Sequence, residues 1–101
     1  MSYQVIYHTD AENDIRNAKK WYKNQQTGLE KKFALALKET ISYIVENPLL
    51  FEVKYRNTRI AFTKVFPYGI HYHFDSNENT ITILSILHTS RDSKIYLSKN
   101  L

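Results

Sequence analysis

Residues 80–88, with the sequence TITILSILH, carry the clearest strand signal in the chain. Five of these nine residues are β-branched, namely Thr80, Ile81, Thr82, Ile83 and Ile86. Side chains of this kind are stiff and pack well on a pleated surface. Because apolar residues stand on both sides of the segment, the pattern predicts a strand at the centre of a sheet.

The residues before this strand predict an antiparallel meander. Residues 76–79 have the composition of a hairpin loop, and residues 70–75 alternate so that Ile70, Tyr72 and Phe74 face one way and His71 and His73 the other. Farther back, the sequence predicts a strand over Arg59–Phe66, a turn at Pro67–Gly69, and a short strand or lead-in over Phe51–Tyr55.

Two amphipathic helices are predicted before the meander. In the first, which is expected to run to about Gln25, the apolar residues recur at helical spacing as Ala11, Ile15, Ala18 and Tyr22. A capping box is predicted at its start, where the Thr9 hydroxyl accepts from the backbone N–H of Glu12 and the Glu12 carboxylate reaches back to Thr9.

The second helix is expected to start near Leu29 and to end at Asn47-Pro48, because a proline disfavours helical geometry at the preceding residue. Gly28, just before it, fits the left-handed position that commonly ends a helix. The predicted buried stripe of this helix is Leu29, Phe33, Leu37, Ile41 and Ile44. The short connection between the two helices predicts an antiparallel helical hairpin.

The predicted fold class is therefore α+β. Tyr3, Val5 and Tyr7 indicate an N-terminal strand, so the element order is β-α-α-β-β-β within a single domain over residues 1–101. The helical pair should cover one face of the sheet. The opposite face is where we expect the functional surface.

Composition excludes several classes of function. The absence of cysteine excludes thiolate catalysis and cysteine-ligated zinc, and no signal peptide or membrane-spanning run is visible, so a cytoplasmic location is expected. With two glycines the chain has no phosphate-binding loop or dinucleotide fingerprint, and no cofactor is expected. The net charge of +4 divides into +1 for residues 1–50 and +3 for residues 51–101, which favours nucleic acid or an acidic protein as partner.

Two polar groups could carry chemistry. His71 and His73 share a strand face and could hold a metal with His88, but no carboxylate stands at a recognisable spacing, so hydrogen-bonded or solvent-facing histidines are the favoured interpretation. The densest polar cluster, residues 88–92 (HTSRD), directly follows the central strand, where a sheet holds side chains rigidly. Arg91 and Asp92 either act in function, or they pair with each other or cap the tail.

Taken together, the chain resembles the ParE/RelE superfamily of type II toxins, also called plasmid stabilisation proteins, and is most similar to the ParE-like branch. The residues that carry this resemblance are Asp14-Ile15, Ala18, Trp21-Tyr22, Gly28-Leu29, Phe33, Ile44, Asn47-Pro48, Phe51, Arg59, Phe66-Pro67-Tyr68-Gly69-Ile70, Tyr72 and Ile86-Leu87-His88-Thr89-Ser90-Arg91-Asp92. The ordered set, and above all the H-x-x-R-D ending, is more specific than any single piece.

The resemblance implies the same β-α-α-β-β-β layout and a cognate antitoxin as partner. It leaves the activity open, because RelE-like members are ribosome-dependent endoribonucleases that cut mRNA, whereas ParE-like members inhibit DNA gyrase. RelE-like chains place an Arg in the middle strand of the meander, and a further Arg and a Tyr after the last strand. Here the middle-strand position falls at Gly69 or its neighbours Tyr68 and Ile70, none of which is basic, although Arg91 and Tyr96 suit the later positions.

We therefore expect a toxin that inhibits an essential target, and we expect that target to be DNA gyrase. The alternatives are an mRNA endonuclease acting on the ribosome, in which Arg91, Tyr96 and Arg59 are the catalytic candidates, and a non-toxic homologue that only binds antitoxin. The residues predicted to contact target or partner are Arg59, His88, Arg91, Asp92 and Tyr96.

Overall fold

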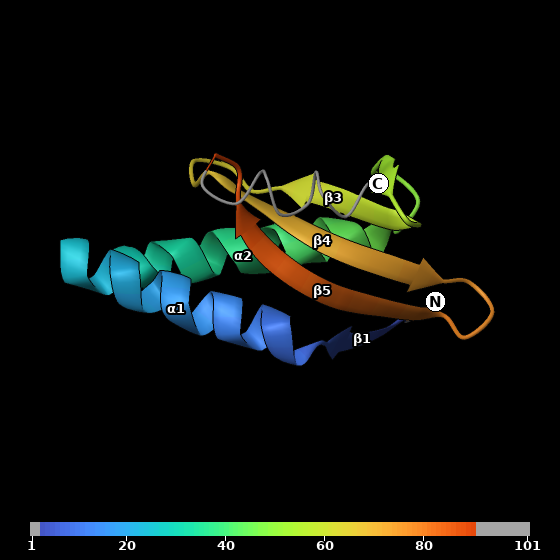
Figure 1. Ribbon diagram of the computed structural model, residues 1–101, viewed down its shortest axis with the longest axis horizontal. Helices are drawn as coiled ribbons and strands as arrows, with labels where there is room; N and C mark the ends of the chain where they lie inside the picture. Colours follow the sequence, from blue (N-terminus) through green and yellow to red (C-terminus); the bar gives the residue numbers. More distant parts are fainter. Residues whose placement is uncertain (1–2, 91–101) are drawn as a thin grey trace.

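The computed structural model describes residues 3–90 and contains five strands and two helices in that part of the chain (Figure 1). Their order is β1-α1-α2-β2-β3-β4-β5. The bounds are Gln4–Tyr7 for β1, Thr9–Gln25 for α1, Leu29–Glu46 for α2, Val53–Tyr55 for β2, Thr58–Phe62 for β3, Tyr68–Asp75 for β4 and Thr80–His88 for β5. The α+β fold class and the predicted bounds of β5 are confirmed.

The five strands form one sheet in the order β1-β5-β4-β3-β2. Strands β2 to β5 pair antiparallel as a meander, and β1 pairs parallel to β5. β5 therefore has a strand on each side, as its apolar sequence predicts. β1 therefore forms one edge of the sheet, and the sequence pattern did not predict which strand it would pair with.

Both helices lie against the same face of the sheet (Figure 1). The core between the layers consists of residues that are at most 7% exposed, and these are Ala11, Ala18, Tyr22, Phe33, Leu37, Ile44, Ala61, Tyr68, Ile70, Tyr72, Ile81, Ile83 and Ile86. Aromatic rings fill the part near the hairpin turn, where the Tyr22 and Phe33 ring centroids are 5.1 Å apart and Phe33 and Tyr68 are 5.0 Å apart. Ile41 is only partly buried and packs at the margin of this core.

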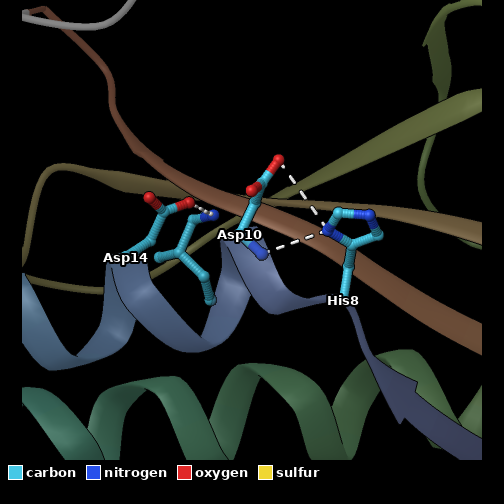
Figure 2. A network of polar contacts seen from close by, with 4 residues as sticks. His8, Asp10 and Asp14 are labelled. Carbon is cyan, nitrogen blue, oxygen red and sulfur yellow. Dashed lines mark hydrogen bonds and ion pairs between the residues drawn. The ribbon is translucent and has the colours of Figure 1, made fainter.

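The start of α1 differs from the predicted capping box. The helix begins at Thr9 itself, and the N-cap is His8, whose ring nitrogen Nδ1 accepts from the backbone N–H of Asp10 at 3.1 Å (Figure 2). The reason lies in the sheet, because the His8 backbone N–H donates to Ile83 O at 2.9 Å and holds His8, the residue after β1, in an extended conformation. The predicted capping box at Thr9 and Glu12 is therefore wrong, and the Glu12 backbone N–H donates to the His8 carbonyl oxygen at 3.1 Å.

The meander also differs from prediction at one turn. β3 ends at Phe62 instead of Phe66, and Tyr68 and Gly69, predicted as turn residues, belong to β4. Val65 has a φ of +71°, which an extended strand cannot contain, so the chain reverses over residues 63–67. Gly28 does adopt the predicted left-handed conformation, with φ +96°, but it precedes α2 as its N-cap, whereas Gln26 caps the end of α1.

The α1–β5 junction depends on Asp14. The backbone N–H of Ile86 donates to the Asp14 carboxylate Oδ2 at 2.9 Å, just beyond the point where β1 stops pairing with β5 (Figure 2). The Asp14 side chain thus accepts a hydrogen bond from a backbone N–H of β5 that β1 is too short to pair with. Through this bond α1 holds the end of β5 that leads into His88.

Candidate functional site

The sheet has a second face, turned away from the helices, to which β3, β4 and β5 contribute side chains. Directly opposed residues of antiparallel strands point to the same face, so the register defines this surface. One row is Ile60, His71 and Ser85, and the next is Phe62, Gly69 and Leu87. We call these six residues the second face.

One residue of the second face, His71, forms a buried pair with Tyr55. The Tyr55 hydroxyl and His71 Nδ1 are 2.7 Å apart, joining β2 to β4 across β3, and both residues are buried. Burial raises the pKa of Tyr55, and a hydrogen bond with Thr58 partly lowers it. A neutral imidazole can donate or accept at Nδ1, so the tautomer of His71 decides which of the two side chains is the donor in this hydrogen bond.

Ser85 stands next to this pair in the strand register. Its Oγ is buried and has no hydrogen-bond partner among residues 3–90. Here β5 has a bulge, because Ser85 opposes His71 whereas Ile83 opposes Tyr72, which leaves Leu84 without an opposite residue in β4. The bulge keeps Ser85 on the second face and Ile83 in the core.

Gly69 occupies the centre of the second face and leaves no room for a side chain. A Cβ at this position would lie 2.9 Å from Ile60 Cγ2 and 3.3 Å from a ring carbon of Phe62. Its neighbours Tyr68 and Ile70 point into the helix-side core, where they are 4% and 0% exposed. None of the three positions considered for a middle-strand cation can therefore present one on this face.

Arg59 lies on the opposite face from His71. It opposes Tyr72 in the register, and its guanidinium donates to the Phe51 carbonyl oxygen at 2.6 Å. The Tyr72 hydroxyl donates to Pro48 O at 2.7 Å, and burial raises the pKa of Tyr72 to about 12 despite the opposing effect of the Arg59 charge. Arg59 thus ties the segment after α2 to the sheet, and its role in binding stays a prediction.

His88 ends β5 on the same side as Tyr68, which it opposes in the register. The two rings meet edge to face, with centroids 5.3 Å apart, and His88 Nδ1 accepts from the backbone N–H of Ser90 at 3.2 Å. By register His88 belongs to the row of Tyr68, but it also lines, together with His71 and Gly69, a small hollow on the second face. The other predicted site residues, Arg91, Asp92 and Tyr96, lie outside the described residues.

No metal site or membrane span is present in residues 3–90. That part of the chain has no group of three or more His, Cys, Asp or Glu side chains arranged to hold an ion. The two strand histidines have protein partners instead: His71 Nδ1 is hydrogen-bonded to the Tyr55 hydroxyl, and His73 Nδ1 lies 3.4 Å from Asn57 O. Neither α1 nor α2 combines the length and the apolar character that crossing a bilayer requires.

The family model described as "ParE toxin of type II toxin-antitoxin system, parDE" matches residues 5–93, which is most of the chain. The chain belongs to this ParE toxin family. No relative was found among curated protein sequences.

Solved structures share the ParE-family fold at low sequence identity. A chain of the chromosomal ParDE TA system from P. aeruginosa superimposes with a TM-score of 0.74 and 14% identity, over 86% of this chain and 96% of that chain. A chain of the RelBE2 toxin-antitoxin complex from Mycobacterium tuberculosis gives 0.63 and 20%, over 87% and 99%. One from the intact E. coli RelBE toxin-antitoxin complex gives 0.58 and 14%, over 89% and 100%. These likenesses show the fold, which ParDE and RelBE proteins have in common.

Sequence reasoning missed two features of this ParE-family site. The Tyr55–His71 pair joins residues 16 apart in the chain, and only the sheet register brings them together. Asp14 was noted for the resemblance alone. An acid beside the apolar stripe of an amphipathic helix is a signal for a buried acceptor, and it could have identified Asp14.

Proposed function

We propose that this ParE-family chain is a toxin that binds and inhibits DNA gyrase in the cytoplasm and is neutralised by a cognate antitoxin. The family supports the toxin assignment. The choice of gyrase over the ribosome depends on the chemistry that the second face can perform.

Gly69 is the observation that carries this choice. Cleaving RNA without a metal requires a base for the 2′-OH, cations that stabilise the phosphorane and an acid for the leaving oxygen. At the centre of the second face, Gly69 is packed against Ile60 and Phe62, and its cross-strand neighbour on β5 is Leu87. A phosphate at this position would meet apolar groups. By analogy with lost oxyanion donors, a missing charge-stabilising group costs roughly 10²–10³ in rate.

A ribosome-dependent mRNA endonuclease is the second candidate, and the Tyr55–His71 pair favours it. A histidine held by a tyrosine hydroxyl 2.7 Å away is a side chain of the kind that serves as general base or acid. His71 is, however, only 2% exposed, and its Nδ1 is already engaged by Tyr55. Under this alternative the charge-stabilising role falls to Arg91 and the leaving-group role to Tyr96.

The antitoxin belongs to the proposal because several of the structural neighbours come from toxin–antitoxin complexes or systems. The net charge of +4 suits an acidic partner segment. A segment that is disordered when free and folds on the toxin can bury a large area and bind tightly. His88, Arg91 and Asp92 remain the proposed contact residues at the end of β5.

The deciding experiment compares the two targets directly with the parent chain and Arg91→Ala. We expect expression of the parent to arrest growth with an SOS response, and the purified protein to inhibit gyrase supercoiling without cutting mRNA on programmed ribosomes. Loss of one buried charged contact costs a binder about 2–5 kcal/mol, so Arg91→Ala should weaken both inhibition and toxicity. Arg16→Ala, an exposed arginine on α1, is the matched control and should behave as the parent.

Two results would overturn the proposal. Codon-positioned mRNA cleavage that disappears in Arg91→Ala, with supercoiling untouched, would establish the endonuclease instead. An absence of any growth phenotype from folded protein would establish a non-toxic homologue that binds only the antitoxin.

A further inference from the structure

The last residues of β5 are held differently on their two sides. On the β4 side the pairing continues to the end, because His88 opposes Tyr68 in the register and the Thr89 backbone N–H donates to Pro67 O at 2.8 Å. On the other side β1 pairs with β5 only as far as Ile83. Beyond that residue the edge of β5 faces α1 instead of a strand (Figure 1). The sheet therefore fixes only one side of the strand end that leads to the proposed contact residues.

Asp14 of α1 supplies a partner on the other side. Its carboxylate Oδ2 accepts from the backbone N–H of Ile86 at 2.9 Å (Figure 2). Ile83 bonds toward β1 through its carbonyl oxygen, and regular alternation would give the next donor on this edge to Ser85. The bulge at Leu84 shifts the alternation by one residue, so that Ile86 is the residue that turns its N–H toward α1.

The sequence of α1 lets a short side chain make this contact. Ala11 and Ala18 lie three residues before and four residues after Asp14, on the same face of the helix, and are 0% and 6% exposed. Side chains this small allow the helix to approach the sheet closely, so a single methylene brings the Asp14 carboxylate to the backbone of β5. The carboxylate of a glutamate, one methylene farther out, would pass the N–H of Ile86 unless the helix moved.

A carboxylate holds this strand end more firmly than a neutral acceptor does. Hydrogen bonds to an ionised group are roughly twice as strong as those between neutral groups. Ile86 is 2% exposed, so without Asp14 its N–H would have to recruit water or stay unsatisfied. The strand end would then depend on β4 alone. Contact residues need supports of this kind, because productive geometry tolerates displacements of only about 0.5 Å.

We propose that Asp14 is a positioning residue for the target-binding end of the protein. Its carboxylate fixes Ile86, and with it the point from which the chain continues through His88 to Arg91 and Asp92. Asp14 acts through the backbone of β5 and does not itself contact the target. This role rests on the proposed function, because a fixed strand end matters for the contacts that the toxin makes there.

The first test measures the strand end itself and needs no toxicity. We expect amide hydrogen exchange at Ile86 in the full chain to become at least about tenfold faster in Asp14→Ala. Asp14→Asn keeps an acceptor oxygen and should retain most of the protection, whereas Asp14→Glu should not. Glu12→Ala, which removes an exposed acid from the same helix, should exchange as the parent does. The exchange rate at Tyr72, in the middle of β4, separates a local change from a loss of the whole fold.

The second test asks whether Asp14 acts through the contact residues. In the supercoiling assay, Asp14→Ala should raise the inhibitory concentration about tenfold, and Asp14→Asn should restore most of the inhibition. Combined with Arg91→Ala, Asp14→Ala should add clearly less than its own loss, because a contact that is already absent cannot be misplaced. A change that only destabilised the fold would instead multiply with Arg91→Ala.

Three results would refute the proposal. These are unchanged exchange at Ile86 in Asp14→Ala, faster exchange there with an unchanged inhibitory concentration, and full multiplication of the two losses in the double variant. If the parent does not inhibit gyrase, the proposed function fails, and the exchange rates still test the bond between Asp14 and Ile86. The two failures are therefore distinguishable.

Discussion

Val65 adopts a backbone conformation that its side chain disfavours. Its φ is +71°, and the Phe66 backbone N–H donates to Lys64 O at 2.7 Å, which closes a γ-turn of the strained, positive-φ kind. The Val65 side chain is 96% exposed, so no burial compensates for the strain. Hydrogen bonds across the loop hold this conformation, because the Thr63 backbone N–H donates to Tyr68 O and the Thr63 hydroxyl donates to Phe66 O.

Val65→Gly should therefore stabilise the fold. Glycine adopts positive φ without a steric penalty, and the gain, reduced by glycine's larger unfolded-state entropy, is expected at about 0.5–1 kcal/mol. Val65→Ala is the control, because it removes the same exposed methyl groups and keeps the Cβ that causes the strain. Thermal and urea unfolding measure both variants. An alanine variant more stable than the glycine variant would contradict the argument.

For single residues, the sequence predicts the face of the sheet to which a side chain points, but not the residues that the side chain contacts. Alternation correctly placed His71 opposite to Tyr72, and the absence of a cation around Gly69 was visible in the sequence. That Gly69 is closed by Ile60 and Phe62 depends on the exact register between β3 and β4, and the hydrogen bond between His71 and Tyr55 depends on the registers of β2 with β3 and of β3 with β4. Such long-range pairings leave no local pattern.

Helix α2 shows where an element-level pattern succeeds. Periodicity predicted its bounds and its stripe, and Phe33, Leu37 and Ile44 are at most 4% exposed. Ile41 belongs to the same stripe but lies at the margin, because it lines a hollow between α1 and α2. A helical wheel cannot separate the centre of a contact from its edge, since that depends on where the neighbouring helix lies.

Leu37→Ala should cost about 2–5 kcal/mol of unfolding free energy, because it removes a nearly buried side chain and leaves a cavity. Ile41→Ala should cost less, near the lower end of that range. Leu35→Ala is the matched control, since Leu35 is 64% exposed on the same helix and should change stability by no more than about 0.5 kcal/mol. Denaturant titration gives all three values. If Leu37→Ala melts within a degree or two of the parent, the face assignment of α2 fails.

The strand boundaries show where an element-level pattern fails. Residues 59–66 are mostly apolar or β-branched and contain no glycine or proline, so the sequence gives no clear turn signal after Phe62. Because proline and glycine are typical turn residues, the sequence predicted the turn at Pro67–Gly69, a few residues too late. The turn is set by Val65 in a conformation unusual for its residue type, and propensities assign strand to such a residue.

On the scale of the whole molecule, two surfaces are separate. Two hollows lie between α1 and α2, and Tyr7 of β1 also lines the smaller one, whereas the second face belongs to the meander on the side of the sheet away from the helices. A partner seated over the helical hairpin need not touch the second face. This separation would let one long segment engage the hairpin while its remainder reaches toward the sheet.

Such a wrapping mode predicts a tight complex with the product of an adjacent antitoxin gene. A segment that folds on binding loses entropy, but it can bury more area than a rigid partner and so form a complex that survives purification. We expect a tagged chain co-expressed with that gene product to elute as one species by size-exclusion chromatography at micromolar concentration. A variant with Lys19→Gln, Lys23→Gln and Lys31→Gln, three lysines that line the larger hollow, should release the partner at lower salt than the parent does, because fewer ion pairs must be screened. Separate elution of the two parent proteins would show that no stable antitoxin complex forms.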